Sequence, residues 1–209
     1  MSELKEWIKI FEDYLGKNPS SDGSHNVGHF RRVWKSANNI MDSDVDQLVV
    51  LAASYFHDII SYPKNHPNRS RSSKDAAIKA EEILTGMNFP EEKIGNIKHC
   101  IEAHSFSANI TPETVEAKVV QDADRMEALG AIGLARTFYV AGKLGSELFN
   151  ENDPLAKERE LDDKKYALDH FKVKLLKLPA TMQTKRGKLE AEKRANILVK
   201  FTEDLQLEL

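Results

Sequence analysis

A histidine and an aspartate stand side by side at the end of a strongly hydrophobic stretch, in SYFHDII, residues 54–60. The segment LVVLAASYF that leads into them has the composition of a buried element. Burying an imidazole and a carboxylate without partners is energetically costly. His57 and Asp58 must therefore meet other polar groups or an ion inside the folded protein.

Polar side chains interrupt two other hydrophobic segments in the same way. His25 and His29 lie four positions apart in SHNVGHFRRV and share a face if this stretch is helical. Asp122 and Asp124 interrupt VVQDADRMEALG. A lone histidine of this kind is more often a hydrogen-bonded core residue than a ligand, but several polar groups from separate buried segments suggest a shared partner.

A metal ion is the simplest shared partner. Neutral imidazoles and carboxylates together suit manganese, iron, cobalt, nickel, zinc or magnesium. A structural zinc site usually takes cysteines, and this chain has a single one, Cys100. We therefore expect a site with open coordination positions that water and substrate can use.

The composition is that of an ordinary globular protein. The chain has 209 residues, 41% of them hydrophobic and 30% charged, with a net charge of -3. We see no signal peptide, no apolar run long enough for a membrane span and no basic stripe. The sequence thus predicts a soluble cytoplasmic protein that binds neither membranes nor nucleic acid, and it leaves the oligomeric state open.

Helical periodicity dominates the chain and predicts an all-α fold. We expect one compact helical bundle that forms a single domain over residues 1–209, with a site core at about 20–145 and C-terminal helices at 150–209 packing on it. The expected helices are 4–15, 26–41, 44–60, 73–87, 90–104, 111–145 with a bend near Gly130 and Gly133, 162–178, and 183–207, the last two separated by Pro179.

The order His29, His57–Asp58, Asp124 resembles the HD-domain superfamily of metal-dependent phosphohydrolases. HFRRVW is similar to the helix of the family's first histidine, YFHDI to its histidine–aspartate doublet, and QDADRMEALGAIG to the helix of its last aspartate. The resemblance covers most of the chain. The stretch LDDKKYALDHFKVKLLKLPATMQTKRGK is similar to the tail of the YedJ/YpgQ-like bacterial subgroup.

The resemblance implies an all-helical fold with a divalent metal ion held by His29, His57, Asp58 and Asp124. Asp124 is the family's aspartate because a basic residue follows it. Asp122 is then expected to orient a ligand histidine through a hydrogen bond. His25 has no counterpart among the family's ligands.

The resemblance also suggests residues that act on the substrate. Asp58 would serve as ligand and accept a hydrogen bond from the attacking water. Lys64, just after the doublet, is the best-placed cation for a phosphate group. For His104 two roles stay open: an extra histidine that binds a second metal or the substrate, or a histidine that only favours the C-terminal end of its helix.

The implied function is hydrolysis of a nucleotide or a related phosphate ester or anhydride by metal-activated water. No glycine-rich phosphate loop is present. Three alternatives remain: a non-catalytic metal- or nucleotide-binding regulatory module, a di-iron oxygenase of the same superfamily, and a purely structural helical protein. The last would leave His57 and Asp58 unexplained.

Overall fold

The computed structural model describes residues 3–18, 27–62 and 66–209. Nine α-helices and three short 3-10 helices make up the regular structure of these residues. They contain no β-strand, only an isolated bridge between Glu147 and Tyr166. The predicted all-α fold is confirmed. None of the helices in the described part of the chain combines the length and the apolar character that crossing a membrane requires.

The chain divides into two compact units, Met1–Asp124 and Arg125–Leu209. The prediction of one domain over residues 1–209 stays a prediction. The first unit holds α1 (Glu3–Lys17), α2 (Val27–Ile40), α3 (Gln47–Phe56), η1 (Arg69–Arg71), α4 (Ser72–Gly86), α5 (Glu91–His104), η2 (Phe106–Ala108) and most of α6 (Val115–Met126). The second unit holds α7 (Gly130–Leu144), α8 (Asp169–Val173), η3 (Leu175–Thr181) and α9 (Lys185–Glu208).

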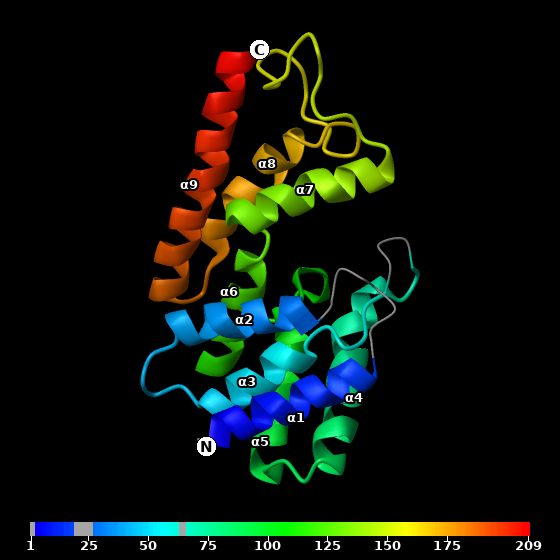
Figure 1. Cartoon of the computed structure of the whole chain (residues 1–209), viewed down its shortest axis with the longest axis vertical. Helices are drawn as coiled ribbons and strands as arrows, with labels where there is room; N and C mark the ends of the chain where they lie inside the picture. The colour runs from blue at the N-terminus through cyan, green and yellow to red at the C-terminus, as the bar shows by residue number, and fades with distance from the viewer. Residues whose placement is uncertain (1–2, 19–26, 63–65) are drawn as a thin grey trace. The chain divides into compact units, whose positions relative to one another are not determined.

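Helix α3 is the centre of the first unit and packs against α1, α2, α4 and α5 (Figure 1). Every residue from Val49 to Phe56 is buried, which explains why this helix is apolar nearly all round. Its N-terminus is capped by Asp46, whose carboxylate accepts the N–H groups of Leu48 and Val49. The pair His57–Asp58 thus follows directly after this buried helix.

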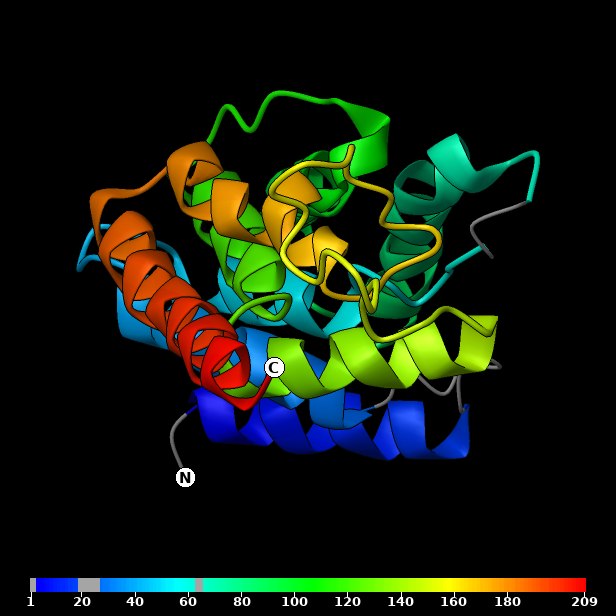
Figure 2. The ribbon, with the colours of Figure 1, turned by 90° about the horizontal axis from the view of Figure 1, so that it is seen from above.

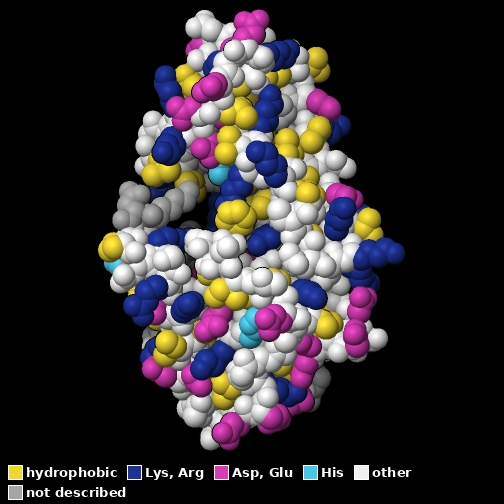
Figure 3. All heavy atoms as spheres, turned by 180° about the vertical axis from the view of Figure 1, so that it is seen from behind, with side chains coloured by type: hydrophobic (Ala, Val, Ile, Leu, Met, Phe, Trp, Pro, Cys, Tyr) yellow, Lys and Arg dark blue, Asp and Glu magenta, His cyan; other side chains and the backbone are white. Residues whose placement is uncertain are grey.

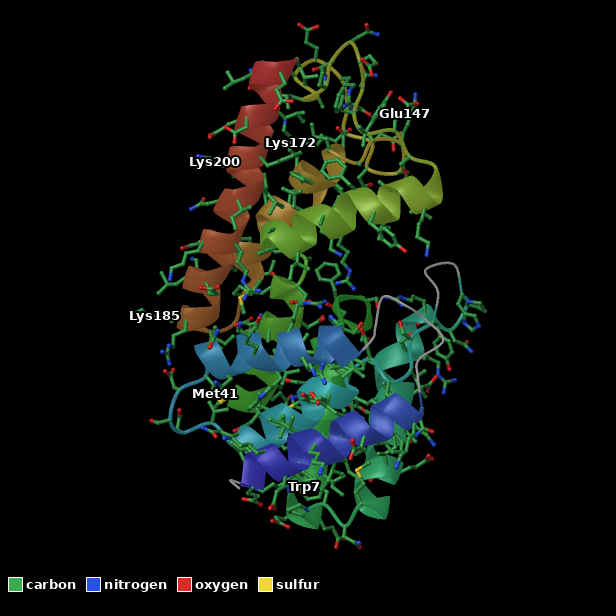
Figure 4. All side chains as sticks on the ribbon, in the orientation of Figure 1. Trp7, Met41, Glu147, Lys172, Lys185 and Lys200 are labelled. Carbon is green, nitrogen blue, oxygen red and sulfur yellow. The ribbon has the colours of Figure 1, made fainter. Side chains whose placement is uncertain are left out.

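Aromatic side chains fix α1 against this centre. The Phe11 ring lies 5.0 Å from the Phe56 ring and 5.8 Å from the Tyr55 ring, measured between centroids. Trp7, labelled in Figure 4, extends the cluster to Phe89 at 4.7 Å. These contacts bury the apolar face of α1 and hold the helix that carries Tyr55 and Phe56 in place.

The expected helix 44–60 is wrong at both ends. It begins only after the Asp46 cap and ends at Phe56, so that His57 is its C-cap residue and Asp58 lies in the following turn. The Ile59 N–H donates to the Phe56 carbonyl, three residues back, instead of continuing the helical pattern. His57 keeps the helical N–H bond to the Ala53 carbonyl and the chain turns after it, so both side chains of the doublet can point to one place.

The expected helix 111–145 is also wrong, because it is two helices. After Met126 the N–H groups of Ala128 and Leu129 bond three residues back, and Leu129 is extended. Gly130 has a φ of 72°, which glycine adopts readily. The chain thus breaks fully between α6 and α7, where the sequence predicted only a bend.

In the second unit, α7 begins against α9 and runs away from it, and the segment 145–168 follows its far end (Figures 1 and 2). Lys185 opens α9 and Lys200 lies farther along it (Figure 4). Basic and acidic side chains are interspersed over the face of the molecule drawn in Figure 3. The long helix α9 was predicted almost to its ends.

The expected helix 162–178 is mostly absent, and Pro179 lies inside η3 instead of separating two helices. The cause is competition from side chains for backbone groups. The Asp169 carboxylate, which is buried, accepts both N–H groups of the Arg159 fork and the Asp162 N–H. Asp153 accepts three backbone N–H groups just before this segment, and within it the Asp162 carboxylate accepts the N–H groups of Lys164 and Lys165.

Candidate metal centre

Four elements of the first unit bring five metal-binding side chains together. His29 comes from α2, His57 and Asp58 from the end of α3, His104 from the last position of α5, and Asp124 from α6. They form two overlapping groups that could hold a metal ion, each with its ligand atoms within 4.8 Å of one another: His29, His57 and Asp124, and His57, Asp58 and His104.

The spacing within the first group suits ligands that share one ion. The Nε2 atoms of His29 and His57 are 3.1 Å apart. The Asp124 Oδ1 lies 3.5 Å from the His57 Nε2 and 3.8 Å from the His29 Nε2. Two atoms bonded at about 2.1 Å to one ion lie about 3.0 Å apart at right angles and about 3.4 Å apart at the tetrahedral angle. The cluster therefore fits a cation with little rearrangement.

The second group connects Asp58 with two histidines. Its Oδ2 lies 3.7 Å from the His57 Nε2, and its Oδ1 lies 3.5 Å from the His104 Nε2. The rings of His57 and His104 meet edge to face with centroids 4.8 Å apart. The two oxygens of Asp58 thus face different partners: Oδ2 faces His57, and Oδ1 faces His104.

Backbone carbonyls orient two of the imidazoles. The Nδ1–H of His57 donates to the Ser54 carbonyl at 3.0 Å, and the Nδ1–H of His104 donates to the Ile101 carbonyl. A histidine whose Nδ1 carries the proton presents its Nε2 lone pair as a ligand. Both rings therefore face the cluster with the nitrogen that can bind a metal.

The cluster is buried on its histidine side and open on its carboxylate side. The side chains of His57 and His29 keep 0% and 2% of their exposure, whereas Asp58 keeps 17% and Asp124 keeps 26%. Water and a small anion can reach the carboxylates without displacing the imidazoles. This asymmetry is what an open catalytic site requires, in contrast to a closed structural one.

Without a cation, the cluster holds a proton. Burial lowers the pKa of His57, but its interaction with Asp124 and the charge of Asp58 outweigh burial and raise the pKa to about 9. Burial acts to raise the pKa of Asp124, yet His57 holds it well below its usual range. A bound cation would take the place of this proton.

The other expected site residues lie as follows. Asp122 is fully buried on α6, and its orienting role stays a prediction. Lys64 and His25 lie outside the described residues.

Sequence reasoning missed Gln121, three positions before Asp124. Its side chain is buried, and its Nε2 donates to the Ala103 carbonyl at 2.7 Å, next to His104. The sequence gives little signal for Gln121, because the residues three and four positions later on the same helix face, Asp124 and Arg125, are polar as well. The distance to Ala103 could not be inferred, because it depends on how α5 and α6 pack.

This chain is similar to known proteins of one domain family. The HD domain family model matches residues 26–129, a span that contains all five clustered side chains. The uncharacterized protein YpgQ of Bacillus subtilis (strain 168) is 30% identical over 216 residues, covering 100% of this chain and 96% of that protein.

Solved structures give the same result for the fold. Bacillus subtilis YpgQ in complex with ADP superposes with a TM-score of 0.74 at 27% identity, over 100% of this chain and 97% of that one. An HD-superfamily hydrolase from Bacillus thuringiensis gives a TM-score of 0.73 at 29% identity, over 99% and 96% of the two chains. The resemblance noted in the sequence is confirmed: this chain belongs to the HD domain family.

Proposed function

We propose that this protein is a metal-dependent phosphohydrolase that acts on a nucleotide or a related phosphate ester or anhydride. The observation that carries the proposal is the convergence of His29, His57 and Asp124 within 4.8 Å, with Asp58 and His104 adjoining them. The carboxylates on the open side are positioned to receive water and substrate. A purely structural role would leave three buried imidazoles and two carboxylates collected at one point without a purpose.

The relatives support both the reaction class and the kind of substrate. The Bacillus thuringiensis relative is called an HD-superfamily hydrolase, and YpgQ of Bacillus subtilis was crystallised with ADP. Both are similar to this chain over nearly its whole length. We therefore take a nucleotide with a phosphate anhydride as the first substrate class to test.

The cofactor of this proposal is a divalent metal ion, one of manganese, magnesium, iron, cobalt, nickel or zinc. His29, His57, Asp58 and Asp124 would hold it. When bound, such an ion polarises a phosphoryl oxygen and lowers the pKa of a coordinated water. The Ser54 carbonyl already orients the His57 imidazole for this, and the carboxylates would balance the charge of the ion.

The side chains around the ion have separate tasks. Asp58 would hold the ion through one oxygen and would accept a hydrogen bond from the attacking water through the other. His104 faces that second oxygen with its Nε2 and would help to hold the oxygen, and the water bound to it, in place. Lys64 remains the proposed phosphate-binding cation, on the basis of its place after the doublet.

Two alternative functions involve the same group of metal-binding side chains. A non-catalytic binding module would use the same metal cluster and differ only in lacking turnover. A di-iron oxygenase is less favoured, because the described residues bring five metal-binding side chains together, few for two iron ions. The metal content and the electron-paramagnetic-resonance spectrum of the purified protein separate the oxygenase from the other two.

The deciding experiment measures phosphate and pyrophosphate release from a panel of nucleotides in the presence of manganese. We expect release by the wild type and none above background by Asp58→Ala. Asp163→Ala is the matched control, because that carboxylate also pairs with a histidine, His170 at 2.8 Å, but outside the cluster. No release from any nucleotide, or release that survives Asp58→Ala in folded protein, would rule the proposal out.

A further inference from the structure

The end of α5 receives a hydrogen bond from α6 directly beside the metal cluster. Gln121 of α6 is buried, and its Nε2 donates to the carbonyl of Ala103 at 2.7 Å. Ala103 is the residue before His104, the last residue of α5. Three positions after Gln121, the same helix α6 supplies Asp124 to the cluster. One amide group therefore joins the helix of His104 to the helix of Asp124.

This bond acts on a part of the helix that α-helical hydrogen bonding leaves open. The last four carbonyls of a helix have no partner within it, so their positions are set by whatever else binds them. The Nδ1–H of His104 donates to the Ile101 carbonyl, and the Nε2 of Gln121 donates to the Ala103 carbonyl. The backbone and the ring of His104 are thus each held by one specific contact.

We propose that Gln121 is a positioning residue that sets His104, and through it the second oxygen of Asp58, for the hydrolysis described above. The inference rests on the proposed function and adds to it a residue that touches neither metal ligand nor substrate. Its effect passes through His104, whose Nε2 is 3.5 Å from the Asp58 Oδ1. A misplacement of about 1 Å at a reacting group can lower the rate by about 10²-fold.

Stability alone does not explain a glutamine at this position. Among the described residues, the Oε1 of Gln121 has no hydrogen-bond partner although it is buried. A buried acceptor without a donor is unfavourable. Methionine, which has nearly the same shape, would remove that oxygen while giving up the bond to Ala103. Gln121→Met should therefore fold, with a melting temperature within about 5 °C of the wild type.

A matched control exists on the same two helices. Asn96 of α5 donates from its Nδ2 to the Glu116 Oε2 of α6 at 3.0 Å and accepts the Thr114 hydroxyl at 2.8 Å. It joins the middle of α5 to the start of α6 through side chains, whereas Gln121 binds beside His104. Asn96→Ala tests whether any loosening of α5 against α6 has the effect that we assign to Gln121.

The kinetic test compares wild type, Gln121→Met, Asn96→Ala and His104→Ala. We expect Gln121→Met to lower kcat by about tenfold. KM and the manganese dissociation constant should stay within about threefold of the wild type, because His104 meets the Asp58 Oδ1, whereas the Asp58 oxygen proposed to bind the ion is the one that faces His57. Asn96→Ala should keep the wild-type kcat. An unchanged kcat in Gln121→Met, or an equal loss in Asn96→Ala, would overturn the proposal.

A double variant asks whether the effect passes through His104. In the His104→Ala background, Gln121→Met should cause no further loss, since the group that it positions is already gone. The same tenfold loss in that background would show that Gln121 acts elsewhere and would overturn the assignment.

An NMR measurement tests the position of the His104 ring without requiring catalytic activity. Long-range proton–nitrogen NMR spectra report the ring nitrogens of each histidine, and His104→Ala identifies the signals of His104. We expect Gln121→Met to shift the His104 signals and to leave the His57 signals in place, with neither moved by Asn96→Ala. Unmoved His104 signals would overturn the proposal even if the protein hydrolysed no nucleotide, so the two proposals fail separately.

Discussion

The Nε2 atoms of His29 and His57 lie 3.1 Å apart, although 28 positions separate the two residues in the sequence. Two ring nitrogens that both presented lone pairs at this distance would repel each other, so a proton or a cation has to lie between or beside them. The nearby Asp124 Oδ1, 3.5 Å from the His57 Nε2, supplies negative charge for either. The fold thus places two ring nitrogens and a carboxylate oxygen around one point that favours a positive charge.

Removing the carboxylate from this position should remove the metal. We expect Asp124→Ala to weaken manganese binding by at least about 100-fold, more than the loss of an outer hydrogen-bond partner usually causes. His99→Ala is the control, because His99 lies outside the cluster and its Nε2 accepts the Glu113 N–H. Titration calorimetry measures both. Retention of wild-type affinity by Asp124→Ala would exclude Asp124 as a ligand.

Metal binding should depend on pH, because the cation replaces the proton on His57. With the pKa of His57 raised to about 9, the metal-free cluster is protonated at neutral pH. We expect manganese affinity to rise about tenfold per pH unit between pH 6 and 8, with release of one proton. Calorimetry in buffers of different ionisation enthalpy counts that proton. Affinity that does not change with pH would contradict the protonated cluster.

The same pKa has a consequence for the stability of the metal-free protein. A pKa that is higher in the folded state stabilises the fold below the unfolded value of 6.5, and this contribution disappears as the pH rises through about 9. We expect the free energy of unfolding in EDTA to fall between pH 6.5 and 9.5. Urea unfolding of the wild type and of His57→Ala measures the effect, and the variant should lack it.

Glu12 should be worth more to stability than its partner Arg31. Its carboxylate accepts two bonds from the Arg31 guanidinium and one from the buried Tyr55 hydroxyl at 2.9 Å. Glu12→Ala leaves that hydroxyl without its acceptor and should cost about 1–3 kcal/mol. The Arg31 side chain is 58% exposed, so Arg31→Ala should cost less than about 1 kcal/mol. Urea unfolding at pH 7 compares the two, and a larger loss in Arg31→Ala would contradict the assignment.

Low pH should remove the difference in the free energy of unfolding between the wild type and Glu12→Ala. The hydrogen bond from Arg31 lowers the pKa of Glu12 below 4.5 although burial acts in the other direction. A lowered pKa gives stability that is present above the unfolded value and is lost as the pH falls through the folded one. We therefore expect the two unfolding curves to approach each other below pH 4.5. A difference that persists at lower pH would mean that the charge of Glu12 is not responsible.

Two glycines on α7 should respond in opposite ways to alanine. A Cβ on Gly133 would lie 2.3 Å from the backbone carbon and oxygen of Ala128, atoms that cannot move independently. Gly133→Ala should cost about 1–3 kcal/mol or more. A Cβ on Gly142 meets nothing within 4 Å, so Gly142→Ala should stabilise by about 0.4–1 kcal/mol. Thermal unfolding of both variants checks the pair, and a neutral Gly133→Ala would contradict the close approach.

Local signals placed the starts of α5 and α9 to within two residues. Pro90 marks the start of α5, and α9 begins one residue after the Thr184 cap that bonds the Gly187 N–H. The predicted helix 162–178 failed for a different reason. Arg159 and the Asp162 N–H donate hydrogen bonds to the Asp169 carboxylate, and these partners are seven or more positions away along the chain.

The sequence by itself determined the fold class, the family and the histidines and aspartates worth examining. These depend on local periodicity and on residue types in a given order, which the chain carries directly. Only the tertiary structure decided that His104 joins the cluster, that α3 ends before the doublet, and that Gln121 reaches the carbonyl of Ala103. Each of these depends on a distance between elements, and such distances are set by how the apolar faces of α2, α3, α5 and α6 pack together.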